Sequence, residues 1–421
     1  MVFSRGQVIS FLGYLTIISL LVPWISIGPL GIRLDYIVLA ISLPILLQEY
    51  LRSLKNFKIV NSLIFIGLLI FLSMLIASFI GNNVFYNKFA ITVPSEFMQI
   101  YIRITAFVLF FIIGIKNLIP YDKFLKYCSF VFIISLLFAL CQILKVPVIN
   151  SITALYATTD NQLRSLNYDS GMRIFGTIGN SLSWGGLCVF FFNYFFFLEK
   201  RLLWRYSGVI LSLLSVFFSG SKTAIITVLI AFLGGMIFKA FISKYKVLGF
   251  LRTVFFIMIV CFGVWTILNI YFQSHLEFIL FRFSRLDDGM SSSSTDGRGY
   301  QILLLTQMFD VDSMRMLFGV GKENLYEIIG FVEVEFFYIL GCYGIIGVIL
   351  HYLLIYYVVR TPLGDGELMV LHKWFIVVSI LSYLIFSLGF YFFRELGAGL
   401  YFWILSGYLI GYSKYSKTIN G

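Results

Sequence analysis

The chain has 421 residues, of which 60% are hydrophobic and only 12% are charged, and its mean hydropathy is +0.95. Soluble domains carry about 25% charged residues, and a water-soluble fold could not bury this much apolar surface. The composition therefore excludes a soluble enzyme, a secreted disulfide scaffold and a nucleic-acid-binding module. The formal net charge of +11 is attributed instead to basic cytoplasmic loops of a membrane protein.

Twelve segments are predicted to span the membrane, since a span needs about 20 mainly apolar residues. They are residues 8–28, 35–51, 60–80, 97–119, 127–147, 176–198, 206–220, 222–240, 252–272, 336–358, 374–393 and 396–412. The first is expected to be retained, because no small-residue cleavage site follows it. The seventh is short and meets the eighth abruptly, so these two are either separate spans or a broken, re-entrant pair. Most of the 47 Phe residues are expected to face lipid.

The distribution of positive charge predicts that both termini lie in the cytoplasm. In that orientation the cytoplasmic loops and the C-terminal tail carry more than half of the 31 Lys and Arg residues, as the positive-inside rule requires. Two outer connections are long, 148–175 and 273–335, and the second contains half of the 20 acidic residues. Long loops of this kind are usually functional or disordered.

The large outer loop is expected to combine a flexible stretch with short helices. Residues 287–295 are rich in Ser, Asp and Gly, which is typical of a flexible segment. Residues 300–308 and 325–329 have the apolar spacing of helices. The predicted organisation is nine membrane helices in 1–272, the large loop in 273–335, and three membrane helices with a cytoplasmic tail in 336–421.

Two arginines near the outer ends of predicted spans are candidate functional residues. Arg103 lies one turn into the fourth span, where an ionisable residue marks a functional site unless its guanidinium reaches outward to the interface. Arg173 precedes the segment Gly176–Asn180 at the start of the sixth span. An arginine and the N–H groups of a helix N-terminus can bind an anion. The same residues can equally form a capped helix start with glycines for close packing.

Further candidates lie in the turn between the seventh and eighth spans and around the large loop. Lys222, in a turn with three hydroxyl groups, suits a phosphate, although a simple polar hairpin has the same composition. Arg298 lies in the loop, and Glu333 and Glu335 lie at the mouth of the tenth span. Such a carboxylate could act as a general base in glycosyl transfer. Helical residues two apart point about 200° apart, so at most one faces a given cavity unless the helix starts between them. Alternatively, both are solvated acids at a helix N-terminus.

No metal site is predicted. The three histidines, His275, His351 and His372, are scattered along the chain. The five cysteines lie in apolar runs and form no close CxxC pair, so they indicate neither a zinc site nor a disulfide framework.

In their order along the chain, these clusters resemble the bacterial O-antigen polymerase and ligase superfamily, and most closely the Wzy-type polymerases of O-antigen and capsule repeat units. The matching residues are Arg173, Gly176, Thr177 and Asn180, then the turn from Ser219 to Thr223, then Gly297, Arg298, Gly319 and Gly321. Glu333, ahead of the Gly-x-x-Gly at Gly344 and Gly347, stands where the ligases carry histidine, which favours the polymerase branch. Lys222 stands where many members have arginine. The resemblance covers about residues 170–350.

The resemblance implies an all-α polytopic fold of the GT-C-like class and a metal-independent glycosyltransferase without a cofactor. It would polymerise undecaprenyl-pyrophosphate-linked oligosaccharides at the periplasmic face of the bacterial inner membrane. Its partners would be a chain-length regulator, a flippase and membrane lipids, with no nucleic acid. Pyrophosphate and glycan would be bound by Arg173 and Arg298, and in second place by Lys222, Arg103 and Asn180. Glu333 would be the first candidate for the base, and Glu335 the second.

Two alternative functions stay open. An O-antigen ligase would be expected to carry a histidine near position 333. A flippase or transporter of lipid-linked oligosaccharides would be expected to have charged residues deep in its spans and short outer loops, and no internal repeat of the kind found in many transporters is visible here. A membrane protein without chemistry is a third possibility that the arginine clusters do not exclude.

Overall fold

The computed structural model contains two compact units whose segments alternate along the chain. Unit 1 comprises Met1–Cys128, Met290–Val377 and Ser387–Gly421, and unit 2 comprises Ser129–Gly289 and Val378–Phe386. The structure describes all residues except 1–3, 28–29, 86–92, 158–163, 165, 167–171, 243–254, 256–261, 264–265, 267–268, 285–292, 312, 331, 365, 393–395 and 421.

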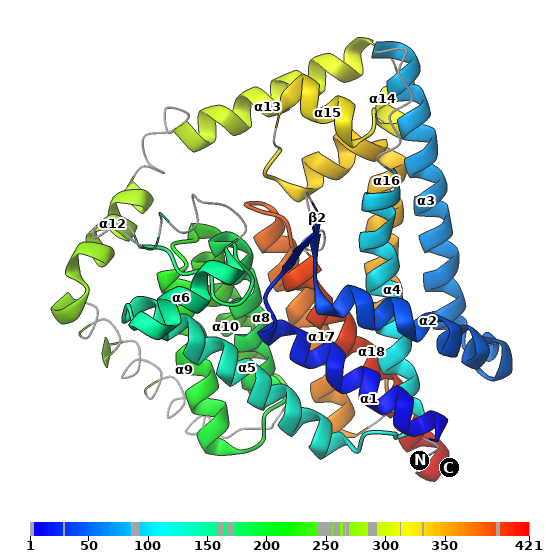
Figure 1. Cartoon of the computed structure of the whole chain (residues 1–421), viewed down its shortest axis with the longest axis vertical. Coiled ribbons are helices and arrows are strands. Elements are labelled where there is room, and N and C mark those ends of the chain that lie inside the picture. The colour runs from blue at the N-terminus through cyan, green and yellow to red at the C-terminus, as the bar shows by residue number, and fades with distance from the viewer. Residues whose placement is uncertain are drawn as a thin grey trace. The chain divides into compact units, whose positions relative to one another are not determined.

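Unit 1 is built from helices and one short antiparallel hairpin (Figure 1). Its elements in chain order are α1 (Arg5–Ile18), η1 (Ser19–Leu21), β1 (Ile25–Ile27), β2 (Leu30–Ile32), α2 (Leu34–Arg52), η2 (Leu54–Asn56), α3 (Lys58–Phe85), α4 (Val93–Ile115), α13 (Ser293–Val311), α14 (Ser313–Phe318), α15 (Lys322–Ile329), α16 (Glu335–Arg360) and α18 (Leu396–Asn420). The hairpin pairs Ile25 with Ile32 and Ile27 with Leu30.

Unit 2 is helical throughout its described part. It contains α6 (Pro147–Tyr156), α8 (Ser181–Phe197), α9 (Leu202–Phe218), α10 (Lys222–Ile242) and α12 (Gln273–Ser284). Two helices belong partly to each unit, α5 (Tyr121–Ile143) and α17 (Glu367–Ser387).

The described helices have the lengths and composition of a polytopic membrane protein. Six are long and apolar enough to cross a membrane, and they are α2, α3, α4, α5, α16 and α17. Four shorter apolar helices lie at Arg5–Leu21, Ser181–Phe197, Leu202–Phe218 and Lys222–Met236. The predicted helical membrane fold is confirmed at this level, whereas the count of twelve spans stays a prediction. The predicted span 396–412 lies inside α18, and most of 252–272 lies outside the described residues.

The abrupt junction between the seventh and eighth predicted spans is a tight turn between two helices. α9 ends at Phe218 and α10 begins at Lys222. Gly220 takes a left-handed conformation with φ of +64°, which a residue without a Cβ adopts at no steric cost. Both segments are helices, and whether they are two separate spans or a re-entrant pair stays a prediction.

Helices α4 and α18 approach each other closely because glycines lie where they meet. A Cβ at Gly407 would lie 2.4 Å from the carbonyl oxygen of Phe107, and one at Gly411 would lie 2.3 Å from that of Phe111. A Cβ at Gly114 of α4 would lie 2.4 Å from a backbone oxygen of α18. Gly407 and Gly411 form a GxxxG pattern, in which small residues let two membrane helices bring their backbones together.

A break in α16 receives part of the large loop. At Gly344 the backbone has φ of +65° and ψ of −169°, which interrupts the helix and frees carbonyl groups from helical hydrogen bonds. The N–H of Val320 donates to the Gly341 carbonyl at 3.1 Å, and the N–H of Gly321 donates to the Cys342 carbonyl at 2.9 Å. The loop backbone thus replaces the hydrogen bonds that α16 loses.

The large loop is helical over the stretches predicted from apolar spacing. α13 contains residues 300–308 and α15 contains 325–329, so this prediction is confirmed. Most of the segment 287–295, predicted to be flexible, lies outside the described residues. In Figure 1 the loop helices lie at one end of α3 and α16, and the two chain termini lie at the other end of the unit.

The expectation that Phe residues mostly face lipid is wrong for α8. Six of its Phe side chains are buried, namely Phe190, Phe191, Phe192, Phe195, Phe196 and Phe197. They pack against α9 and α10, with the Phe195 ring against Gly208 and the Phe196 ring 6.1 Å from that of Phe232. Composition could not show this, because lipid and a membrane-protein interior are equally apolar.

Replacing Gly411 with Ala is expected to lower the stability of unit 1. The new methyl group would lie too close to the Phe111 carbonyl, and overpacking of this kind costs about 1–3 kcal/mol, although Ala intrinsically favours a helix over Gly by about 1 kcal/mol. Thermal unfolding in detergent measures the change. Gly234→Ala on α10 is the matched control, because no described atom lies within 4 Å of a Cβ there. Equal unfolding midpoints for the two variants would contradict the close approach.

Candidate functional site

The structure places the predicted site residues in two clusters, one in each unit. Arg103 and Glu335 belong to a pocket in unit 1, and Arg173, Asn180 and Lys222 lie around the turn before α10 in unit 2. Glu333 and Arg298 also belong to unit 1, and Glu333 is not among the residues that line the pocket.

The pocket in unit 1 is lined by residues of α3, α4 and α16. These are Met74, Glu96, Gln99, Ile100, Arg103, Glu335, Tyr338, Ile339, Tyr343 and His351. Glu96 and Arg103 are 4% exposed, and Glu335 is 2% exposed. Ionisable side chains buried in a membrane-type helical unit are energetically costly and are found mainly at functional sites.

The Glu96 carboxylate joins three other side chains. Its Oε1 lies 3.1 Å from the Lys322 ammonium nitrogen at the start of α15. Its Oε2 accepts hydrogen bonds from the hydroxyls of Tyr338 at 3.2 Å and Tyr343 at 2.9 Å. These partners compensate the loss of hydration that a buried carboxylate suffers.

Glu335 is the first residue of α16 and lines the pocket. The N–H of Phe392 donates to its Oε2 at 3.0 Å, and the positive end of the helix dipole favours a negative charge at this position. Because α16 begins at Glu335, Glu333 lies on the extended segment that precedes it and is half-buried. Of the two predicted carboxylates, Glu335 is thus the one that lines the pocket.

Arg103 is buried rather than extended to an interface. It lies on α4 and contributes to the same pocket as Glu335 and Glu96. The alternative considered from the sequence, a side chain reaching outward into water, therefore does not describe this arginine. Arg103 thus supplies a buried positive charge to a pocket that the Glu96 and Glu335 carboxylates also line.

His351 also lines this pocket, although the sequence indicated no role for it. Its Nδ1 lies 2.7 Å from the Gly347 carbonyl oxygen, and its ring stacks on that of Tyr343 with centroids 5.8 Å apart. A carbonyl accepts only from a protonated nitrogen, so Nδ1 carries the proton and Nε2 has the free lone pair in the neutral ring. In this tautomer His351 can accept a proton at Nε2.

The cluster in unit 2 is centred on Arg173. The N–H of Ile174 donates to the Phe218 carbonyl at 3.1 Å, which holds the segment against the end of α9. The Arg173 side chain lies over Gly220, where a Cβ would be 3.2 Å from its Nε, and its Cζ lies 5.9 Å from the Phe278 ring centroid. Burial lowers the pKa of Arg173, but a guanidinium remains charged at physiological pH.

Gly176 and Asn180, which follow Arg173 in the sequence, make hydrogen bonds within unit 2. The Asn180 side chain caps α8 by accepting hydrogen bonds from the N–H groups of Leu182 and Ser183. Gln142, which the sequence did not single out, accepts from the N–H of Gly176 at 3.0 Å and donates to its carbonyl at 3.2 Å. The capped helix start that the sequence analysis gave as an alternative is therefore present, and Asn180 is the N-cap residue of α8.

Lys222 begins α10 directly after the turn that holds Arg173. Within this turn the Ser219 hydroxyl accepts from the N–H of Ser221, and the Ser221 hydroxyl accepts from the N–H of Ala224. Two of the three hydroxyl groups thus shape the turn. The Arg173 side chain thus lies over Gly220, two residues before Lys222, and both cations belong to unit 2.

Arg298 lies within α13, and its side chain is outside the described part of the chain. Among the described residues, no three His, Cys, Asp or Glu side chains are grouped closely enough to hold a metal ion.

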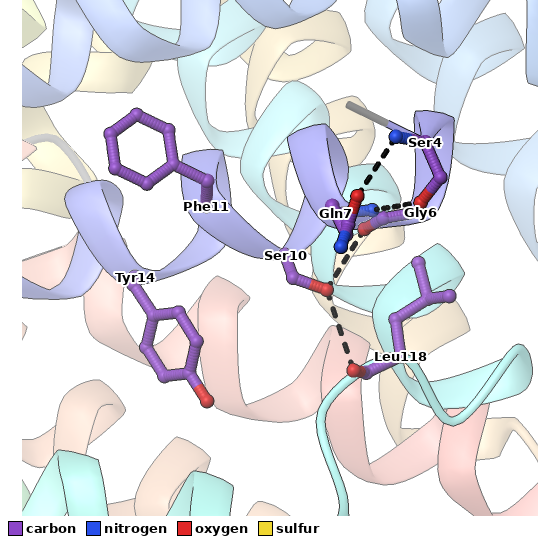
Figure 2. Close-up of a pocket in the computed structure, with 7 residues that line it drawn as sticks. All are labelled: Ser4, Gly6, Gln7, Ser10, Phe11, Tyr14 and Leu118. Atoms are coloured by element: carbon purple, nitrogen blue, oxygen red, sulfur yellow. Dashed lines mark hydrogen bonds between the residues drawn. The ribbon is translucent and has the colours of Figure 1, made fainter. Parts of the chain in front are cut away.

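A second pocket lies along α1 and has a different character (Figure 2). It has a volume of about 550 Å³ and is lined by Ser4, Gly6, Gln7, Ser10, Phe11, Tyr14 and Leu118. Figure 2 shows that its polar side chains bond within the pocket wall, where the Ser10 hydroxyl donates to the Gly6 carbonyl and Gln7 pairs with Ser4. No charged side chain lines it, so it is the weaker candidate for chemistry.

Glu96 is the main site residue that sequence analysis missed. Glu96, Gln99 and Arg103 follow one another at the spacing i, i+3, i+7, which places them on one face of a helix. This polar stripe in an otherwise apolar span was a usable signal. His351 carried no comparable signal, because its neighbours in the pocket are distant in sequence.

In comparisons with known proteins, no family model and no curated protein matches this chain.

The stability of unit 2 is expected to fall as the pH is lowered from about 6.5 to 4, because of His275 in α12. This side chain is 3% exposed among Phe217, Phe218 and Phe278. Burial, and secondarily the positive charge of Arg173, lower its pKa from 6.5 to about 4. The unfolded chain binds this proton below pH 6.5 and the folded chain does not, so up to about 3 kcal/mol is lost across the window.

Thermal unfolding between pH 7.5 and 4 measures this loss. His275→Phe, which suits the aromatic surroundings, should flatten the pH dependence, while the two proteins behave alike at pH 7.5. Parallel curves for wild type and variant would assign the pH dependence to other groups.

Proposed function

We propose that this protein polymerises undecaprenyl-pyrophosphate-linked oligosaccharide repeat units into O-antigen or capsular polysaccharide. The resemblance of its motifs to the Wzy-type polymerases suggests the reaction. The observation that carries the proposal is the pocket in unit 1, where the Glu335 carboxylate lies at the start of a membrane helix beside Arg103 and beneath a helical loop. A base and a cation are what glycosyl transfer from a pyrophosphate requires.

The reaction assigns a separate task to each charge. The acceptor hydroxyl oxygen bonds to the anomeric carbon of the donor glycan, and the bond from that carbon to the pyrophosphate oxygen breaks. The hydroxyl proton passes to a carboxylate, for which Glu335 is now the first candidate and Glu333 the second. The pyrophosphate leaves on its lipid carrier, and fixed cations stabilise its developing charge.

The cations proposed for the pyrophosphate are Arg173 and Arg298, with Lys222 and Arg103 in supporting roles. The Arg173 side chain packs over the turn that Lys222 follows in unit 2, and the hydrogen bond from Ile174 to Phe218 holds the Arg173 segment against that turn, which pre-organises the two cations for an anion. Asn180 would contribute through the helix start that it caps. The resemblance implies a metal-independent, GT-C-like enzyme, and the proposal needs no cofactor.

The proposed location is the bacterial inner membrane, with both termini in the cytoplasm and the large loop in the periplasm. The basic loops predicted to be cytoplasmic support this orientation. So does the arrangement of unit 1, in which the loop helices and the chain termini lie at opposite ends of the long helices (Figure 1). A flippase would supply the substrate at the periplasmic face, and a chain-length regulator would act with the enzyme.

A lipid-linked oligosaccharide flippase or transporter is the second candidate. The observation that favours it is the burial of Glu96, Arg103 and Glu335 together with His351 along α4 and α16. Chains of acids and histidines within spans are typical of proton-coupled transporters. The large loop helices favour the polymerase instead.

Deletion of the gene is expected to remove the ladder of long chains and leave a single repeat unit on the lipopolysaccharide core. Separation of lipopolysaccharide or capsule on a gel measures this, with the plasmid-borne gene as the control. Bare core with long chains accumulating on the lipid carrier would assign a ligase instead. Bare core without any periplasmic intermediate would assign a flippase.

Replacing Glu335 with Gln is expected to reduce polymerisation more than replacing Glu333 with Gln. Loss of a general base typically costs about 100-fold to 10,000-fold in rate, and Glu335 is the carboxylate that lines the pocket. Chain-length ladders from cells with equal amounts of each variant protein provide the measurement. A ladder that survives Glu335→Gln but is lost in Glu333→Gln would transfer the role of base to Glu333.

A further inference from the structure

We infer that Glu96 is a positioning residue of the unit 1 pocket. Its carboxylate holds the loop helix α15 at the pocket and fixes the positions of the stacked Tyr343 and His351 rings. Its part in catalysis rests on the proposed polymerase function. Its part in holding α15 can be tested without any activity. Neither role follows from the motifs that support the resemblance.

Glu96 joins three segments that are distant from one another in the sequence. One carboxylate oxygen contacts Lys322 of the large loop, and the other accepts from Tyr338 and Tyr343 on the two turns of α16 that follow Glu335. Glu96 itself lies on α4. A single buried carboxylate therefore connects a membrane helix, the broken helix and the outer loop.

The large loop is attached to unit 1 at residues 319–322, next to the break in α16. Residues 319–321 lie in the break of α16 through two backbone hydrogen bonds, at Gly341 and Cys342. Gly319 permits the approach, because a Cβ there would lie 2.3 Å from the Cys342 carbonyl carbon. Lys322 follows directly. Its side chain is 37% exposed, and its ammonium group pairs with the buried Glu96 carboxylate. The ion pair thus fixes the start of α15 over the pocket.

Inside the pocket, Glu96 also holds the Tyr343 side chain. Tyr343 immediately precedes Gly344, where α16 has no helical backbone to hold it. Its hydroxyl bond to Glu96 sets the orientation of the ring, and that ring stacks on His351 with an interplanar angle of 9°. Loss of the Glu96 charge would therefore loosen α15, and loss of the whole carboxylate would also loosen the surroundings of His351, while Glu335 keeps its own hydrogen bond to Phe392.

The variant Glu96→Gln tests this inference, because Gln can still accept from the tyrosines but cannot pair with Lys322. Hydrogen exchange of the α15 amides, residues 322–329, is measured on the full chain in lipid nanodiscs. We expect exchange to accelerate by about tenfold or more, since α15 loses the ion pair that holds its first residue. Lys322→Met should accelerate it similarly, and the double variant should be no faster than either single variant.

Glu49→Gln is the matched control. Glu49 is also a 4% exposed carboxylate of unit 1, and it pairs with Arg5 at 3.1 Å and with Lys116. It contacts neither α15 nor the pocket. This variant should leave exchange in α15 unchanged even if it lowers overall stability. Equal effects of Glu96→Gln and Glu49→Gln, or unchanged α15 exchange in both Glu96→Gln and Lys322→Met, would overturn the inference.

The proposed role of Glu96 in catalysis is tested by the kinetics of chain elongation in membranes. Because a positioning residue acts through other groups, Glu96→Gln should lower kcat with little change in the KM for the lipid-linked repeat unit. A raised KM at unchanged kcat would overturn the positioning role. If the wild-type membranes form no polymer at all, the proposed function fails, and the exchange experiment still decides whether Glu96 anchors α15.

Discussion

Unit 1 depends on the compensation of a buried negative charge. The Glu96 carboxylate is almost fully removed from solvent within apolar helices, and an isolated charge there would cost far more than a folded protein can lose. The chain meets this constraint with Lys322 and two tyrosine hydroxyls. Since these partners come from the outer loop and from α16, satisfying the charge also determines where the loop lies.

The second constraint is that backbone polar groups in an apolar interior must find partners. Gly344 breaks α16, and the loop backbone supplies the missing donors at Gly341 and Cys342. Glycine at 319 and 344 makes this possible, because any side chain would meet the opposing backbone. The same use of small residues brings α4 and α18 together. Glycines thus serve close packing as well as the turns in which sequence motifs usually place them.

The candidate residues of the proposed reaction are divided between the two units. The carboxylates Glu333 and Glu335 and the cations Arg103 and Arg298 belong to unit 1, whereas Arg173 and Lys222 lie around one turn of unit 2.

The sequence by itself determined the helical membrane class and the helices of the large loop, because apolar length and apolar period are local properties. It also identified Arg103 and Glu335 as ionisable residues near span ends. Only the tertiary structure decided that Glu335 rather than Glu333 lines the pocket, and that Glu96 and His351 join it. Such groupings depend on where α16 begins and which helices meet, and these are set by packing and charge compensation between segments far apart in the chain.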